Sequence, residues 1–146
     1  VVTVVPVSSK SNDQYSLWKI PKGGDNEGSL CNTNCYIYIT ATWSENVIMT
    51  GEDNESSTVT IVIGDGGEAV SRTADYYAGW VGGPVGGFIR YRYAIQRDDP
   101  LDTDGILIGA NAITLNYDII TDLAGNVAPI THSATVEDNN YQVKNW

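Results

Sequence analysis

The chain has 146 residues, of which 18 are acidic and 8 are basic, giving a net charge of -10 at pH 7. The length suits a single domain, residues 1–146, with one hydrophobic core. Because the charge repels phosphate backbones and anionic lipids, and no apolar stretch approaches the ~18 residues of a membrane helix, we expect neither nucleic-acid binding nor membrane insertion.

The first segment, residues 1–9 with the sequence VVTVVPVSS, is rich in β-branched residues and predicts a strand. Pro6 has no N–H to donate, so we expect this strand at the edge of a sheet. The segment carries no charged side chain, and two interpretations stay open. It pairs within its own domain, or it acts as a donor strand that completes the sheet of a neighbouring copy.

A long polar loop follows at residues 21–35 and contains both cysteines, Cys31 and Cys35, in the sequence CNTNC. Zinc takes about four nitrogen or sulfur ligands, and the only histidine, His132, is far away in the sequence. We therefore favour a short-loop disulfide formed in an oxidising compartment. Two free thiols in a reducing compartment are the alternative.

Three segments alternate apolar and polar residues with the period of two that is typical of half-buried strands. They are YIYITATW at 36–43, STVTIVI at 57–63 and FIRYRYAIQ at 88–96. The residues expected to face the core are Ile37, Ile39, Ala41, Trp43, Val59, Ile61, Ile63, Ile89, Tyr91, Tyr93 and Ile95. Arg90 and Arg92 fall on the opposite side of the third segment.

A glycine-rich loop, AGWVGGPVGG at residues 78–87, interrupts this pattern and carries Trp80. Tyr76 and Tyr77 precede the loop. Aromatic side chains with a polar tip suit half-exposed positions, including sugar-stacking surfaces and protein interfaces. Trp80, Tyr76 and Tyr77 are therefore candidates for a ligand or interface surface, and the alternative is that Trp80 folds back over the domain as a lid.

An acidic segment, RDDPLDTDG at residues 97–105, brings four carboxylates together at Asp98, Asp99, Asp102 and Asp104. Calcium takes about six to eight oxygen ligands, and a cation would offset the repulsion among clustered carboxylates. The segment therefore predicts a Ca²⁺ site and no organic cofactor. A solvated acidic turn without an ion is the alternative.

Further strands are predicted at GILIGANAITL, YDIIT and NYQVKNW, and no window predicts a helix. DLAGN, at residues 122–126, has the composition of a tight turn. Asp122 can accept hydrogen bonds from amides two or three residues on, while Gly125 and Asn126 tolerate positive φ. We interpret DLAGN as a self-capped structural turn, with a direct ligand role for Asp122 as the alternative.

Catalytic signatures are weak throughout the sequence. A Ser-His-Asp triad has only His132 to serve as its base, and no pair of acidic residues stands out as a glycosidase pair. The stretch GGPVGG lacks the Lys-Ser/Thr ending of a phosphate-binding loop. We therefore expect that the protein is not an enzyme.

Three motifs of the chain occur together in one known family. They are the aromatic step Trp43-Ser44-Glu45, the acidic turn from Asp102 to Gly105, and the Leu115-Asn116 step that leads to DLAGN. With NNYQVKNW at the end, they resemble the bacterial Ig-like repeats of large secreted adhesins and cyanobacterial surface proteins, over roughly residues 36–146. The cysteine-bearing loop and the glycine-tryptophan loop depart from the family pattern.

The strand pattern predicts an all-β Greek-key sandwich, and the resemblance makes it an Ig-like β-sandwich of about 7–10 antiparallel strands. The resemblance implies a non-catalytic structural or adhesive module, a building block of a bacterial surface fibre, filament or adhesin. It also implies an extracellular or cell-surface location, with other copies or neighbouring domains of the same fibre as partners. A carbohydrate-binding module that uses the Trp/Tyr loop, or an Ig-like component of a phage virion, are the alternatives.

Overall fold

The computed structural model describes residues 2–7, 18–19, 36–50, 57–80, 87–96, 98–135 and 142–144. For residues 2–7, 18–19, 50, 78–80 and 144 it describes the backbone alone. The regular elements in these ranges are strands, apart from a short 3-10 helix, η1, at Gly66–Glu68. The all-β prediction is therefore confirmed. Among the described residues, no helix has the length and apolar character needed to cross a bilayer.

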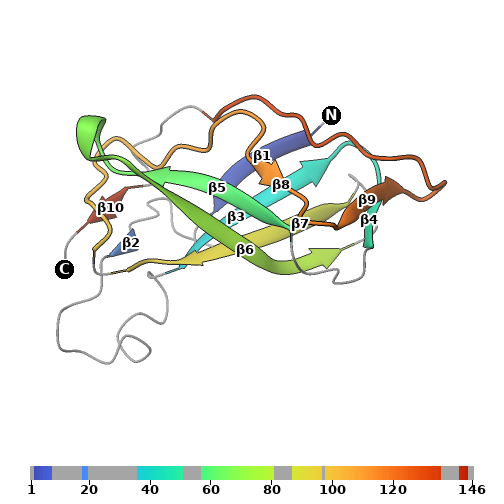
Figure 1. The fold of residues 1–146 in the computed structure, drawn as a ribbon, viewed down its shortest axis with the longest axis horizontal. Coiled ribbons are helices and arrows are strands. Elements are labelled where there is room, and N and C mark those ends of the chain that lie inside the picture. The colour runs from blue at the N-terminus through green and yellow to red at the C-terminus, as the bar shows by residue number, and fades with distance from the viewer. Residues whose placement is uncertain are drawn as a thin grey trace.

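The main sheet has six strands, in the order β1-β3-β7-β6-β5-β8 (Figure 1). They are β1 (Val2–Val7), β3 (Tyr36–Trp43), β7 (Phe88–Ala94), β6 (Val70–Trp80), β5 (Thr58–Ile63) and β8 (Ile113–Thr114). All neighbouring pairs in this sheet are antiparallel. The edge position predicted from Pro6 is confirmed, because β1 is the last strand on one side and Pro6 pairs with Ile39. In this structure residues 2–7 of the first segment thus pair within their own chain.

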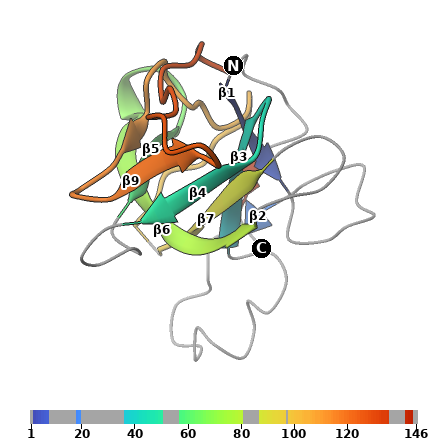
Figure 2. The ribbon, with the colours of Figure 1, turned by 90° about the vertical axis from the view of Figure 1, so that its right-hand side faces the viewer.

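Two shorter pairs complete the strands. β4 (Val47–Thr50) pairs antiparallel with β9 (Ile119–Asp122), and β10 (Val143–Lys144) pairs parallel with β2 (Trp18–Lys19). The parallel pair departs from the expected antiparallel arrangement. Seen end-on, the main sheet curves from β5 through β6 to β7 and β3 (Figure 2). The C-terminal third of the chain, described at residues 98–135 and 142–144, lies across the open side of this curve.

The inward faces predicted from the alternation are confirmed. The predicted inward residues of β3, β5 and β7 are buried, except that Tyr93 is half-buried, and Ile95 just beyond β7 is buried too. From the C-terminal third, Ile106, Ile108 and Ile120 join the same core. Trp43 links the main sheet to the C-terminal third, because its indole N–H donates to the carbonyl oxygen of Pro129 at 2.7 Å.

Two predictions about the extent of strands are wrong. The stretch GILIGANAITL contains only the two-residue β8 and a single bridge between Leu107 and Val62. Asn111 in its middle has a φ of 56°, which is incompatible with a continuous strand. Residues 78–80, expected in a loop, continue β6 instead, because the hairpin with β7 extends to the pair Trp80 and Phe88.

Cys31 and Cys35 lie outside the described residues, as does the rest of the loop at 21–35. The disulfide therefore stays a prediction.

Candidate functional site

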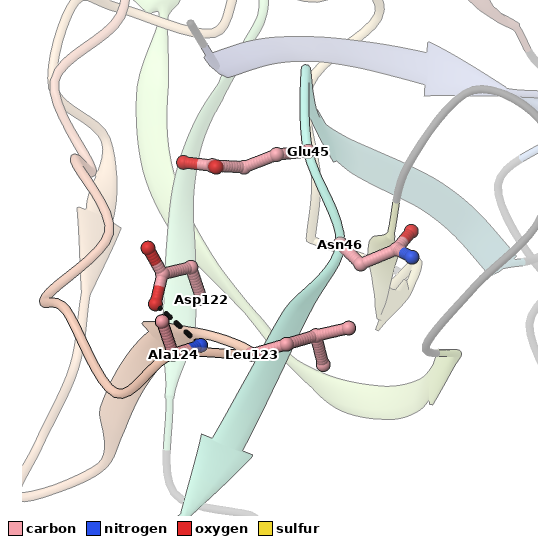
Figure 3. Close-up of a pocket in the computed structure, with 5 residues that line it drawn as sticks. All are labelled: Glu45, Asn46, Asp122, Leu123 and Ala124. Carbon is pink, nitrogen blue, oxygen red and sulfur yellow. Dashed lines mark hydrogen bonds between the residues drawn. The ribbon is translucent and has the colours of Figure 1, made fainter.

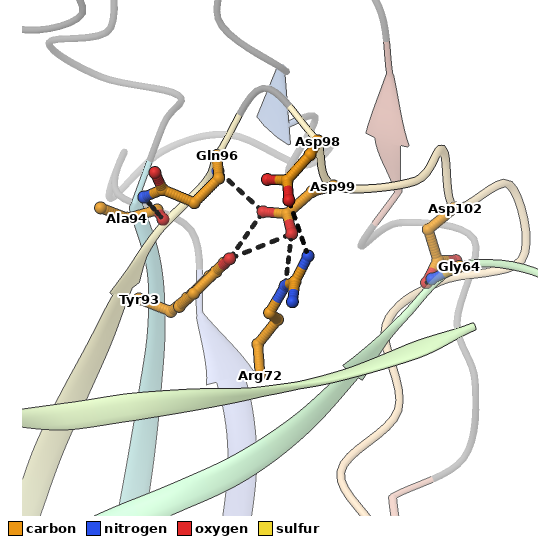
Figure 4. Close-up of polar contacts among 8 residues, drawn as sticks. All are labelled: Gly64, Arg72, Tyr93, Ala94, Gln96, Asp98, Asp99 and Asp102. Atoms are coloured by element: carbon orange, nitrogen blue, oxygen red, sulfur yellow. Dashed lines mark hydrogen bonds and ion pairs between the residues drawn. The ribbon is translucent and has the colours of Figure 1, made fainter. Parts of the chain in front are cut away.

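The acidic segment that the sequence singles out follows β7 at one end of the domain. Its four aspartates do not form one cluster: Asp98 and Asp99 face Arg72 of β6, while Asp102 lies apart from them, against Gly64 (Figure 4). The ligand set predicted from sequence is thus divided between two places. Each of them has its own chemistry.

The first place is a buried polar network around Asp99. Arg72 lies on the inward side of β6, and its Nε donates to Oδ1 of Asp99 at 2.6 Å. The hydroxyl of Tyr93 donates to the same carboxylate at 2.8 Å, and so does the amide of Gln96 at 2.7 Å (Figure 4). Asp99 is 4% exposed, so its carboxylate is buried at the end of the core and is neutralised there by Arg72.

The network raises the pKa values of Arg72 and Tyr93. The hydrogen bond to Asp99 raises the pKa of Arg72. Burial, and then the hydrogen bond to Asp99, raises the pKa of Tyr93 well above its ordinary value. Because protein donors occupy the carboxylate of Asp99, its assignment as a metal ligand is not supported by the geometry. Asp98 is 3.7 Å from Arg72 with 81% of its side chain exposed, and exposed pairs of this kind contribute little.

The second place is a cluster of three carboxylates from Asp65, Asp102 and Asp104, whose oxygens lie within 4.8 Å of one another. Sequence analysis missed Asp65, which lies in the glycine-rich turn between β5 and β6, far from the acidic segment along the chain. The backbone amide and hydroxyl of Thr103 donate to Asp65 at 3.0 and 2.6 Å. These bonds, the hydroxyl's first, lower the pKa of Asp65.

Asp102 is the buried member of the cluster, with 1% exposure. Its carboxylate accepts the amides of Gly64 at 2.8 Å and Gly105 at 2.7 Å, which joins the turn after β5 to the acidic segment. Gly64 has a φ of +113°, and a Cβ there would lie 2.7 Å from Cγ of Pro100, so this close approach requires glycine. Burial raises the pKa of Asp102 to about 6, although the two amides oppose the shift.

The cluster supplies three carboxylates toward the six to eight oxygens, roughly, that Ca²⁺ takes. Hydrogen bonds within the protein already use part of this capacity, at Asp102 and at Asp65. The calcium prediction therefore stays a prediction, and its ligand set changes. Asp65 joins Asp102 and Asp104, and Asp98 and Asp99 leave.

The DLAGN turn is built around the Asp122 carboxylate. Oδ1 accepts the amides of Ala124 at 2.9 Å and Asn126 at 2.8 Å, and Oδ2 accepts the side-chain amide of Asn126 at 2.9 Å. Gly125 has a φ of 90°, whereas Asn126 contributes through its side chain and not through a positive φ. These bonds, led by the Asn126 side chain, lower the pKa of Asp122 and hold it as a carboxylate within its own turn.

An open surface pocket lies beside this turn (Figure 3). It is lined by Glu45, Asn46, Asp122, Leu123 and Ala124. The Asn46 and Leu123 side chains point to the same side in Figure 3, away from the carboxylates of Glu45 and Asp122. Because the Asp122 carboxylate is engaged by its own turn, the pocket offers no paired carboxylates positioned for acid–base chemistry.

The aromatic residues proposed as one surface are separated in the structure. Tyr76 packs against the core, while Tyr77 is 46% exposed on the other face of the main sheet. Tyr77 contacts Tyr38 and Arg92 on the outer face, whereas Tyr76 pairs with the buried Tyr91 of β7, so the two rings do not form one platform. The backbone of Trp80 lies in β6, and its side chain lies outside the described atoms.

His132 has a structural arrangement. Its Nε2 accepts the amide of Ala112 at 2.9 Å, and its Nδ1 lies 2.8 Å from the carbonyl oxygen of Ser133. The proton therefore lies on Nδ1, and both ring nitrogens bond to the backbone. With 9% exposure, the imidazole joins two turns of the C-terminal third and has no nitrogen free to act as a base.

No family model, no curated protein and no solved structure matches the chain. The relation to bacterial Ig-like repeats thus rests on the sequence motifs alone.

Replacing Asp99 should be far more damaging than replacing its neighbour. Asp99→Ala leaves Arg72 and two further donors without their acceptor, so we expect the free energy of unfolding to fall by about 2–4 kcal/mol. Asp98→Ala is the matched control, with an expected change within about 0.5 kcal/mol. Urea unfolding of both variants measures the difference, and equal losses would contradict the buried network.

The raised pKa of Asp102 predicts a pH dependence with a defined sign. The folded state holds this proton more tightly than the unfolded chain, whose aspartate titrates near 3.8. The carboxyl therefore stabilises the protein at low pH, and this contribution is lost as the pH rises from 3.8 to about 6. A ¹³C NMR titration in EDTA should give a midpoint near pH 6 for Asp102, and a midpoint at or below the ordinary aspartate value would contradict it.

Calcium is tested by thermal unfolding in millimolar Ca²⁺ against EDTA. An ion on the cluster would relieve the repulsion among its carboxylates, so we expect a higher melting temperature in Ca²⁺. The double variant Asp65→Asn/Asp104→Asn should abolish the increase, while Asp98→Asn should retain it. No shift in the unaltered protein, with no heat in calorimetric titration, would remove calcium from the account.

Proposed function

We propose that the chain is a non-catalytic structural module of an extracellular or cell-surface fibre or adhesin, built as an Ig-like Greek-key sandwich. The observation that carries the proposal is the placement of the first and last described strands. β10 lies at one end of the long axis, and β1 begins in the other half of the domain and runs toward that end (Figure 1). Modules joined through these strands would be strung end to end.

The pairing of β1 suits a load-bearing role. All six residues of β1 pair with β3, from Val2 opposite Trp43 to Val7 opposite Tyr38. A force along the long axis would pull β1 lengthwise past β3, so the hydrogen bonds of the pair would be loaded together and not one after another. The hydrogen bonds would then share the force, and the pair would resist a larger force than one that separates bond by bond.

The use of the buried polar residues also supports a structural role. The carboxylates of Asp99 and Asp102 and the ring of His132 each bond to groups of the same chain. A catalytic acid or base needs a donor or acceptor directed at a substrate. The buried titratable groups in the described part of the chain instead hold turns and layers together.

The partners in this proposal are other copies or neighbouring domains of the same fibre. β1 pairs with β3 on one side, and no described strand pairs with its other side. Such an edge can accept a strand from a neighbour, with Pro6 limiting the pairing because it has no N–H. Joining of neighbours by strand addition thus remains part of the proposal, with β1 as the receiving edge.

Single-molecule force spectroscopy tests the load-bearing proposal. The domain is pulled first through its two chain ends, which loads the β1–β3 pair in shear. It is then pulled through its N-terminus and a cysteine introduced as Ala124→Cys, in the exposed turn that follows β9. We expect a clearly higher unfolding force in the first geometry.

The second geometry is the matched control, because it unzips β1 from β3 one hydrogen bond at a time in the same protein. Equal forces in the two geometries, or a lower force through the chain ends, would contradict a load-bearing module.

A further inference from the structure

Four side chains on the outer face of the main sheet form a surface that the structural role does not use. Tyr36 and Tyr38 come from β3, Tyr77 from β6 and Arg92 from β7, and we call them the tyrosine–arginine face. A register shift between Tyr76 and Ala78 marks a β-bulge at Tyr77. The contacts of Tyr77 show that the bulge directs its ring toward β7 and β3.

The members of this face contact one another in a fixed arrangement. The guanidinium carbon of Arg92 lies 5.0 Å from the ring centre of Tyr36 and 4.6 Å from that of Tyr77. The Tyr77 ring meets Tyr38 edge-on at 5.5 Å between centres, and Tyr38 lies 6.2 Å from Tyr36. Cation–π and edge contacts of this kind hold the four side chains before any ligand arrives.

Arg92 is exposed, and no carboxylate among the described side chains lies within ion-pair distance of it. Arg72, by contrast, is neutralised by Asp99. The guanidinium of Arg92, held near two tyrosine rings, carries paired N–H donors along its planar edge. Such an edge matches the two oxygens of a carboxylate.

An acid, Asp75, lies opposite Arg92 on β6 and is exposed. It weakens the attraction for an anion, as does the net charge of -10. At physiological ionic strength, however, charges are screened beyond about 8 Å, so the groups in direct contact with a ligand dominate. The face therefore offers Arg92 beside three tyrosines. Arg90, two residues away on the same side of β7, lies over the Phe88 ring and donates to Thr40.

We propose that the tyrosine–arginine face binds a glycan that contains uronic acid. The apolar C–H side of a pyranose ring lies against the exposed Tyr77, and its carboxylate accepts two hydrogen bonds from Arg92. Charge complementarity selects the acidic sugar over a neutral one, and the tyrosines select a sugar over a small anion. Binding here uses side chains on the outer face of the sheet, whereas the load-bearing role uses the backbone pairing of β1 with β3, in which Tyr38 takes part opposite Val7.

Calorimetric titration with tetragalacturonate and tetramannuronate tests the proposal. The fully methyl-esterified tetragalacturonate is the matched neutral probe, because it has the same sugar and linkage without the charges. We expect binding of at least one acidic tetrasaccharide and about tenfold weaker or undetectable binding of the ester. Arg92→Gln should weaken acidic binding by about tenfold or more, and Arg92→Lys by less, because lysine keeps the charge without the planar fork.

Two further variants sharpen the test. Asp75→Asn should tighten acidic binding, since it removes a like charge, and should leave the ester unchanged. Tyr77→Ala should weaken binding, whereas Tyr117→Ala, which removes a 95% exposed tyrosine in the turn between β8 and β9, should not.

Three results would overturn the proposal: no binding of either acidic tetrasaccharide, equal binding of the ester, or acidic binding that survives Arg92→Gln. A self-association seen in sedimentation, lost in Arg92→Gln and unaffected by the saccharides, would assign the face to a second copy instead. Thermal unfolding of each variant confirms that it is folded.

Discussion

The structure depends on how its buried backbone amides find hydrogen-bond acceptors. The inward face of the main sheet is covered by the C-terminal third of the chain, which contains few strands to supply them. Backbone amides that are buried without a neighbouring strand still need acceptors. Buried side chains supply them: Asp102 accepts from Gly64 and Gly105, and His132 accepts from Ala112. Asp118, in the same way, accepts the amide of Ser57 at 2.7 Å. These polar residues take the place of a hydrogen-bonded ladder.

This constraint also decides where function can lie. An aspartate or histidine that satisfies a buried amide cannot be redirected to a substrate without leaving that amide unpaired, which is costly. The groups available to partners are therefore on the surface: the carboxylates of Asp65 and Asp104, the outer edge of β1 and the tyrosine–arginine face. The proposed module, which bears load and contacts ligands through its surface, would use these groups.

The sequence predicted the faces of the strands well, because a period of two determines which side chains can be buried together. It did not predict that adjacent Asp98 and Asp99 differ, since this depends on Arg72 pointing inward from another strand. Arg72 and the buried Ala74 are two residues apart in one strand and therefore share a face, and this spacing could have shown in the sequence that Arg72 points inward. Asp65 gave no comparable signal, because only the packing of the β5–β6 turn brings it to Asp102 and Asp104.

Native-state hydrogen exchange of individual amides tests the central claim most directly. If buried side chains replace a ladder, the amides of Gly64, Gly105 and Ala112 should exchange as slowly as the amides of β3. The amide of Ala124, which lies in an exposed turn and donates to Asp122, should exchange much faster and serves as the internal reference. Exchange of the three buried amides at the rate of Ala124 would contradict the account.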